Sequence, residues 1–438
     1  GHLRRVPLQR EHALPEEGAP QAHAVEAAHE PAVAPGLHGV AAPAAEELAE
    51  ELADAPVDPG AAAPLARHRA ARDHPVEIRV DPDLEAVLPD GALQPSRDAQ
   101  GAATFEANGT GPYRLVARTP DVATELARFD GWWGGTPDVE RATFRPLASD
   151  ATRVAALLSG AVDLIEPVPL QDVARLEQVR GIDVLSGIES RVIFFGFDHE
   201  GDGPLADRRV REAIYRTLDA EAIVERIMRG RARTAGLLIG PGVNAYAAAA
   251  DTRLEVDRER ARALLAEAGH GDGFALELRC PNDRYIADEA ICTAAVGMLR
   301  QIGIEATLDA VPVGIYWDEL RRGDFDMYLL GWSPGTFDAE HPIRFLLHTP
   351  DPDRRLGSWN FGGFSNARID ELLPQIQREL DPEARQAMID EVHTIMKDEV
   401  AYVPMHVQPL VWAVRDRFEV QQRPDNFVIL RWIETQNE

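Results

Sequence analysis

Two short groups of side chains in the second half of the chain have residue types that could carry out acid–base chemistry. Asp324 and Asp326 lie two residues apart in a segment with strand character, so their carboxylates share one face of it. A pair of carboxylates on one face could act as general acid and general base. We favour a structural interpretation, in which Asp324 is exposed at the start of the strand and Asp326 stabilises the fold.

The second group consists of Asp338, Glu340 and His341, which form a dense polar cluster. A hydrolase of peptide or amide substrates could use these three side chains, and we keep it as an alternative. A hydrolytic metal centre would need further ligands, and the sequence offers none at a recognisable spacing. The chain contains no HExxH, GxSxG or GxxxxGKS/T motif, so we expect no enzyme, no cofactor and no metal site. His341 is then expected to be a wall or surface residue.

The elements that must position these side chains can be read from the apolar periodicity. Residues 326–331 form a short apolar run, which predicts a buried parallel strand. The chain then breaks at 333–335 and restarts as a helix near Pro342. Strands and helices alternate through most of the sequence, as in βαβ units. Helix N-caps are expected at Ser149 or Asp150, at Asp219 and at Asp257.

The loop after the apolar strand is the predicted ligand site, because open α/β sheets bind ligands beyond the carboxyl ends of their strands. Aromatic side chains supply contact area in such sites, and a few polar groups orient the ligand. Asp338 could hold a ligand ammonium group, and Asn360 could pair with a peptide-like backbone. The predicted ligand-binding residues are Tyr316, Trp332, Ser333, Phe337, Asp338, Trp359 and Asn360.

The stretch from Gly323 to Asn360 resembles the extracytoplasmic solute-binding proteins of ABC transporters, in the oligopeptide-, dipeptide- and nickel-binding family (family 5). That family has a Gly-x-x-Asp strand ending in Gly-Trp, then an Asp-containing loop and a Phe-Leu helix. Further landmarks of the family stand in the expected order, namely a turn at 131–137, a helix at 205–219, a helix and strand start at 261–274, and a Val-Pro step at 403–404. The resemblance extends from Phe105 to Trp432.

The resemblance implies an α/β fold, namely a two-lobed periplasmic-binding-protein-like fold (type II, cluster C) with mixed sheets and an interlobe cleft. Lobe I would comprise residues 101–192 and, after the chain returns, residues 406–438. Lobe II would comprise residues 193–405. The Trp332 loop and the turn at 357–360 would lie at the cleft.

The resemblance also implies a function, that of the extracytoplasmic substrate-binding component of an ABC importer, in the periplasm or at the cell surface. A peptide-like solute would be bound by hinge closure and delivered to a permease in the membrane. We expect a monomer. The identity of the ligand and any lipid anchor stay open, because members of the family bind peptides, sugars, opines and metal complexes.

The composition limits the partners and the size of the fold. A chain of 438 residues with 45% apolar and 27% charged residues suits two or three mostly globular domains. The net charge of -28 argues against nucleic acid and anionic membranes as partners. The sequence has no run of about 18 apolar residues that would predict a membrane span, and no export signal is visible in it.

Residues 1–100 differ from the rest of the chain. The first 75 residues contain no Ile, Phe, Tyr or Trp, so they cannot bury enough apolar area to offset chain entropy. We expect disorder or a frame-shifted segment over 1–100, with one helix at 43–55, and the family's early hairpin motif is absent. A truncated paralogue that binds no solute is therefore a further alternative. Seven histidines here have no metal-ligand spacing and are expected to lie at the surface: His2, His12, His23, His29, His38, His68 and His74.

Cys280 and Cys292 are the two cysteines of the chain. They form no CxxC motif and have no histidines at metal-binding spacing. Two small, partly buried thiols are the favoured interpretation. A disulfide is the alternative in an oxidising compartment, and the sequence does not decide between the two.

Overall fold

The computed structural model of the chain describes residues 76–78, 93–97, 103–107 and 109–436. The chain divides into two units, Gly1–Ala71 and Arg72–Glu438. The first unit lies outside the described residues, and so do the helix predicted at 43–55 and the seven N-terminal histidines. Two short strands, β1 (Val76–Ile78) and β2 (Leu93–Arg97), are described within the segment 1–100, and the expectation of a disordered or frame-shifted start stays a prediction.

The described residues of the second unit contain a mixed sheet with the strand order β11-β10-β12-β8-β13-β7-β1-β6-β5-β4, in which β9 also pairs with β13. Its strands are β1 (Val76–Ile78), β4 (Tyr113–Thr119), β5 (Ala123–Arg128), β6 (Arg141–Phe144), β7 (Leu164–Ile165), β8 (Ile182–Phe197), β9 (Arg233–Thr234), β10 (Ala275–Pro281), β11 (Glu305–Val311), β12 (Met327–Trp332) and β13 (Tyr402–Arg415). Two small pairs stand apart from it, β2 (Leu93–Arg97) with β3 (Ala103–Ala107), and β14 (Phe418–Glu419) with β15 (Glu434–Thr435). Parallel and antiparallel pairs both occur, as the expected mixed sheet requires.

Ten α-helices are described, and several follow the predicted ranges closely. They are α2 (Asp150–Ser159), α3 (Val173–Leu176), α4 (Arg208–Tyr215), α5 (Ala220–Arg226), α6 (Arg258–Glu267), α7 (Asp288–Arg300), α8 (Val313–Arg322), α9 (Glu340–Pro342), α10 (Ala367–Ile376) and α11 (Pro382–Asp398). The side chains of Ser149, Asp219 and Asp257 accept backbone hydrogen bonds at the starts of α2, α5 and α6. The predicted N-caps are therefore confirmed, with Ser149 rather than Asp150 at α2.

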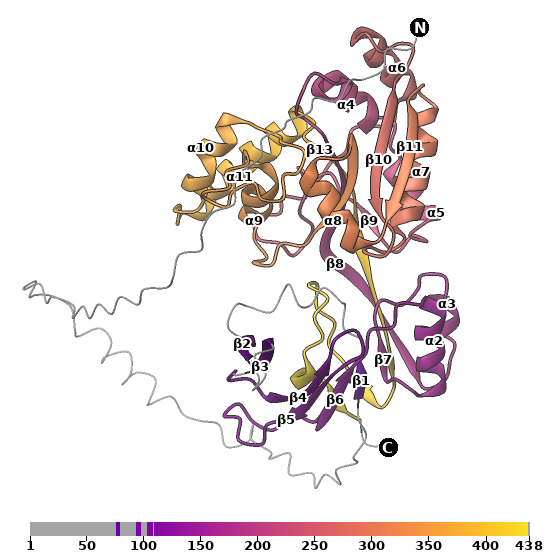
Figure 1. Cartoon of the computed structure of the whole chain (residues 1–438), viewed down its shortest axis with the longest axis vertical. Helices are drawn as coiled ribbons and strands as arrows, with labels where there is room; N and C mark the ends of the chain where they lie inside the picture. The colour runs from indigo at the N-terminus through magenta and orange to yellow at the C-terminus, as the bar shows by residue number, and fades with distance from the viewer. Residues whose placement is uncertain (1–75, 79–92, 98–102, 108, 437–438) are drawn as a thin grey trace, which may run out of the picture. The chain divides into compact units, whose positions relative to one another are not determined.

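Two long strands, β8 and β13, run side by side through the sheet (Figure 1). At one end β13 also pairs with β7, and at the other end β8 also pairs with β12. The predicted lobe boundaries at 192 and 405 therefore fall inside two continuous strands. β13 passes through Pro404 and Pro409, and its register against β8 shifts beside each proline.

The core is built on both faces of these strands. Ile193 and Phe195 of β8 pack into one hydrophobic cluster, and Phe194 between them packs into another. This follows from the alternation of side chains along a strand. β12 is buried along its whole length, with β10 parallel to it on one side and β8 antiparallel on the other. The predicted buried strand at 326–331 is confirmed as β12. The predicted parallel pairing is confirmed for the β10 side only, because β8 pairs with β12 antiparallel.

The structure joins the two cysteines in a disulfide, which is the alternative that the sequence analysis did not favour. Cys280 lies at the end of β10 and Cys292 on α7, with 6.6 Å between their Cα atoms. α7 packs back against β10 and β11, and this packing brings the two cysteines together. Both side chains are fully buried.

Reduction of this disulfide is expected to lower the free energy of unfolding by about 3 kcal/mol, because the bond restricts the unfolded chain. Denaturant midpoints with and without a reducing agent measure the change. A Cys280→Ala/Cys292→Ala double variant is the control, and its midpoint should not respond to the reductant. Equal midpoints for the oxidised and reduced wild-type protein would contradict the pairing.

Candidate functional site

The segment after β12 leaves the sheet as a loop and returns as an irregular helix. Trp332 ends β12, and Phe337 adopts a left-handed backbone conformation with φ 52° in the loop. α9 then continues directly into a π-helical turn, η3 (Ile343–Leu347). Single π-helical turns occur frequently at functional sites. The predicted restart of a helix near Pro342 is confirmed, although the helix is short.

Four rings from this segment and the following turn form an aromatic cluster, which we define as Trp332, His341, Phe345 and Trp359. The Trp332 ring lies 5.3 Å from His341, 5.7 Å from Phe345 and 5.6 Å from Trp359, measured between centroids. The Trp332 indole Nε1 donates a hydrogen bond to His341 Nδ1 at 3.1 Å. His341, Phe345 and Trp359 are half-buried, so the cluster borders the surface.

Asp338 is tied into the protein by three hydrogen bonds. Arg385 Nη2 and the Glu340 amide donate to its Oδ1 at 2.7 and 2.8 Å, and Asn244 Nδ2 donates to its Oδ2 at 2.7 Å. Partial burial acts to raise the pKa of the Asp338 carboxyl, but the hydrogen bonds from Arg385, Glu340 and Asn244 lower it on balance. The carboxylate therefore fixes the loop to its neighbours and has little capacity left for a ligand ammonium group.

Asn360 is buried, and its side-chain amide bonds to the backbone. Its Nδ2 donates to the His348 and Phe364 carbonyls at 3.0 and 2.7 Å, and its Oδ1 accepts from the Phe364 amide at 3.0 Å. These bonds use the groups that were expected to face a peptide-like ligand. The geometry thus supports a turn-stabilising role for Asn360, beneath Trp359.

Tyr316 belongs to the core. The residue is 0% exposed, and its hydroxyl donates a short hydrogen bond to the Leu329 carbonyl at 2.5 Å. Burial raises the pKa of the Tyr316 phenol well above its usual range. The expectation that Tyr316 lines a cleft is not supported, because an aromatic residue on α8 faces β12 here.

Replacing Tyr316 by Phe is expected to destabilise the fold by about 1 kcal/mol, because the Leu329 carbonyl loses its buried donor. Chemical denaturation of the Tyr316→Phe variant measures the change in the free energy of unfolding. A variant as stable as the wild type would show that this hydrogen bond contributes nothing net.

Ser333 connects the loop to β8. Its hydroxyl lies 2.6 Å from the hydroxyl of Ser190. Next to Ser190, the buried Glu189 carboxylate accepts from Gln408 Nε2 at 2.6 Å and from Arg191 Nε at 2.9 Å. The loop is thereby linked to the strands β8 and β13 at the place where their register shifts.

The acidic groups do not assemble into catalytic arrangements. Asp326 Oδ2 accepts from the Glu277 amide, which joins β10 to the start of β12, and Asp324 Oδ2 accepts from Arg322. Glu340 Oε1 accepts from Gln377 Nε2 at 2.6 Å. Within the described part of the chain, no hydrogen bond joins the His341 ring to the carboxylate of Asp338 or Glu340.

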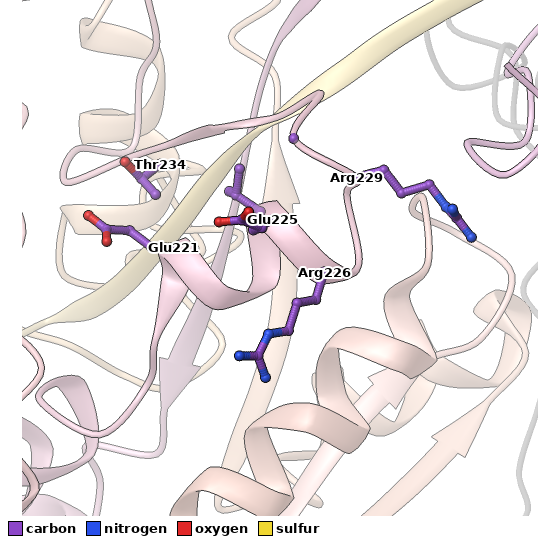
Figure 2. Close-up of a pocket in the computed structure, with 7 residues that line it drawn as sticks. Glu221, Glu225, Arg226, Arg229 and Thr234 are labelled. Carbon is purple, nitrogen blue, oxygen red and sulfur yellow. The ribbon is translucent and has the colours of Figure 1, made fainter. Parts of the chain in front are cut away.

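The described residues contain neither a group of three potential metal-ligating side chains nor a helix long and apolar enough to cross a membrane. A hollow of about 750 Å³ lies around α5 and β9. Figure 2 shows two of its side chains, Arg226 and Arg229, extending in different directions. Its lining is charged and includes no ring, unlike the apolar lining typical of small-molecule sites.

Residues that the sequence analysis did not single out complete the aromatic cluster and fix its loop. Phe345 follows His341 by four residues, a spacing that could have indicated a shared face. Arg385 and Asn244 are far from Asp338 in the chain, and no local pattern signals them. The structure brings together Trp332, Ser333 and Trp359 as predicted neighbours, whereas Tyr316 and Asn360 lie in the interior.

Comparison with known proteins gives a family match over most of the chain. Residues 21–353 match the family model described as bacterial extracellular solute-binding proteins, family 5 Middle. This match begins well before Phe105, the point from which the quoted motifs extend. The glutathione-binding protein GsiB of Shigella dysenteriae serotype 1 (strain Sd197) is 27% identical over 317 residues, which cover 70% of this chain and 60% of that protein. GsiB of Escherichia coli O157:H7 matches to the same extent, so the chain spans about 60% of the length of these curated relatives.

Solved structures share the fold. The periplasmic binding protein DppA of Helicobacter pylori, in complex with the peptide STSA, has a TM-score of 0.67 at 20% identity and covers 75% of this chain and 63% of its own. AgaA of Agrobacterium tumefaciens R10, in complex with agropinic acid, has a TM-score of 0.67 at 23% identity, with coverage of 78% and 69%. NikA of Staphylococcus aureus, in complex with Ni(L-His)2, has a TM-score of 0.67 at 19% identity, with coverage of 78% and 72%. The expected periplasmic-binding-protein-like α/β fold is confirmed.

Proposed function

Because the chain belongs to the bacterial extracellular solute-binding proteins of family 5, we propose that it is the substrate-binding component of an ABC importer. In this role it acts outside the cytoplasm, takes up a small solute and delivers it to a permease in the membrane. The observation that carries the proposal within the structure is the aromatic cluster beyond the carboxyl end of β12. Loops at that end of a strand are the usual ligand sites of open α/β sheets.

The proposed solute site is the surface formed by Trp359 and the loop residues Ser333 and Phe337, with the 8% exposed Trp332 packed against Trp359. The two indoles supply apolar area, and the backbone and hydroxyl groups of the loop supply orientation. Asp338 stays in the proposed site as the residue that holds the loop through Arg385. Asn360 and Tyr316 support the site from below.

The proposed solute is peptide-like. The curated relatives are named for glutathione, and the solved neighbours contain the peptide STSA, agropinic acid and Ni(L-His)2. These compounds share amide or amino-acid groups that aromatic faces and loop hydroxyls can accommodate. We propose binding without a covalent step, since His341 bonds to Trp332 rather than to a carboxylate.

Hinge bending at β8 and β13 is the proposed route to closure. The register shifts beside Pro404 and Pro409 interrupt regular pairing, and a strand bends most easily at such points. The Ser190–Ser333 contact would transmit movement between these strands and the solute loop. We propose that the protein works as a monomer.

A thermal-shift and calorimetric screen against dipeptides, tripeptides, glutathione and nickel–histidine tests this function. A solute present at a hundredfold excess over its Kd should stabilise the protein by about 2.7 kcal/mol. In the same assay, Trp359→Ala is expected to weaken binding about tenfold, because the indole loses its contact with the solute.

The matched control is Trp133→Ala, since Trp133 is 85% exposed and lies outside the proposed site. This variant should bind as the wild type does. If no compound shifts the transition, the receptor function is rejected for this chain. Turnover of a bound peptide, lost in Asp338→Asn, would favour a hydrolase instead.

A further inference from the structure

Arg344 lies on the π-helical turn η3, between His341 and Phe345 of the aromatic cluster. Its guanidinium carbon is 5.0 Å from the centroid of the Phe345 ring. That ring is 4.8 Å from the His341 ring and 5.7 Å from the Trp332 ring. Burial lowers the pKa of His341, and the charge of Arg344 lowers it further, which agrees with a guanidinium close to the cluster.

Arg344 has no ion pair or side-chain hydrogen bond within the part of the chain that the structure describes, and its Nε is buried without a partner. Other arginines of the same region are paired, for example Arg385 with Asp338 and Arg368 with Glu391. The chain has 73 acidic and 45 basic residues, so acidic partners are abundant. A cation that stays unpaired among so many carboxylates is open to an anionic partner from outside.

The carboxylates nearest in sequence are committed elsewhere. Asp338 is held by Arg385 and Asn244, and Glu340 accepts from Gln377. Glu340 precedes Arg344 by four residues, a spacing that aligns side chains on an α-helix. The α-helix α9 changes at Ile343 to the π-helical turn η3, where hydrogen bonds run from residue i to residue i+5, and no ion pair joins Glu340 to Arg344 within the described residues.

We propose that Arg344 recognises a carboxylate of the transported solute, whose apolar part lies against Trp332 and Trp359. The inference rests on the proposed function and specifies the charge class of its ligand. A guanidinium presents its donors in a planar fork that matches a carboxylate with two parallel hydrogen bonds. The solute is therefore a small organic acid, such as a peptide with a free carboxyl group. It is not held through an ammonium group at Asp338.

The test uses 3-phenylpropionate and its neutral amide as probes of the subsite, followed by NMR of the tryptophan indole signals of the full chain. The wild-type protein should bind the acid saturably. It should bind the amide at least about tenfold more weakly, since hydrogen bonds to charged groups contribute about 1.5–3 kcal/mol. Arg344→Gln should reduce the affinity for the acid to that for the amide. Arg229→Gln removes an equal charge outside the site, where Arg229 lines the hollow of Figure 2, and should leave both affinities unchanged.

Two results would overturn the inference. In one, the acid and the amide bind the wild type equally or neither binds. In the other, Arg344→Gln retains the wild-type affinity for the acid while its melting temperature shows that it is folded. The outcome is separable from that of the solute screen. If the acid binds through Arg344 but no solute in the screen binds, the receptor function is rejected and the anion subsite stands. If a solute binds in the screen but Arg344 does not distinguish acid from amide, only the subsite is rejected.

Discussion

Lowering the pH from 7 to 5 is expected to destabilise the protein by roughly 5 kcal/mol, because three buried histidines must stay neutral in the folded state. Burial lowers the pKa of His406 to about 3, with the charge of Arg253 adding to the effect. Burial likewise lowers the pKa of His199 and of His393 to about 4. Neither ring nitrogen of His406 has a hydrogen-bond partner among the described residues.

The sign follows from proton binding in the two states. Between a folded pKa near 3 or 4 and an unfolded pKa of about 6.5, the unfolded chain binds more protons, so stability is lost as the pH falls. Each histidine then costs about 2 kcal/mol at pH 5, a value set mainly by the unfolded pKa. Asp288 acts in the opposite direction, because burial raises the pKa of its carboxyl, and it offsets part of the loss at lower pH.

Chemical denaturation at pH 7, 6 and 5 measures this dependence. His406→Leu should remove about 2 kcal/mol of the loss at pH 5, since an apolar side chain needs no proton partner. His270→Gln is the control, because His270 is half-buried at the surface beside Phe274. A wild-type protein with the same unfolding free energy at pH 7 and pH 5 would show that these histidines are protonated or hydrated in the folded state.

Arg211→Met is expected to cost about 3–5 kcal/mol, because it leaves several buried carbonyls without a donor, each at a cost of about 1–3 kcal/mol. Arg211 on α4 is 5% exposed. Its guanidinium donates to the carbonyls of Leu205, Ala206, Glu399 and Val400, at distances of 2.6–3.1 Å. Burial lowers its pKa to about 10, so it remains charged at neutral pH. The substitution leaves all four carbonyls without this donor and detaches α4 from the end of α11.

The matched control for Arg211→Met is Arg208→Met, three residues earlier on the same helix. Arg208 has a side chain that is 46% exposed, forms an ion pair with Glu212 at 2.7 Å, and donates one hydrogen bond to the Asp398 carbonyl. Exposed pairs of this kind contribute at most about 1 kcal/mol. Similar losses in the two variants would mean that the buried carbonyls find other donors.

Local features of the fold could be predicted from the sequence, because they depend on near neighbours. The capping side chains of Ser149, Asp219 and Asp257 accept hydrogen bonds from amides three positions on, so neighbouring residues are enough to predict their role. The buried strand β12 was predictable for the same reason, since its apolar run is continuous. The motifs around Gly323–Asn360 then identified the fold as a whole.

The site could be predicted only in outline, because its residues take partners from distant segments. Nothing near Asp338 in the sequence indicates an ionic partner for its carboxylate. In the folded chain Arg385 forms an ion pair with it. Asn360 and Tyr316 have polar atoms suited to a ligand, yet both bond to backbone groups in the interior. The cysteine pairing depends on how α7 packs on β10, which spacing alone does not specify.

Three indole rings near the solute loop, those of Trp317, Trp359 and Trp332, are in contact, and this has a consequence for the fluorescence of the protein. Trp317 lies 5.3 Å from Trp359, which lies 5.6 Å from Trp332, with ring planes 84° and 65° apart. Because the three rings are in contact, a change at one indole alters the surroundings of its neighbour. Trp332 donates its indole hydrogen bond to His341, so the environment of its ring depends on the position of that histidine. A solute that binds against Trp359 should therefore change the fluorescence of these rings. Intrinsic tryptophan fluorescence would then report solute binding without an added label.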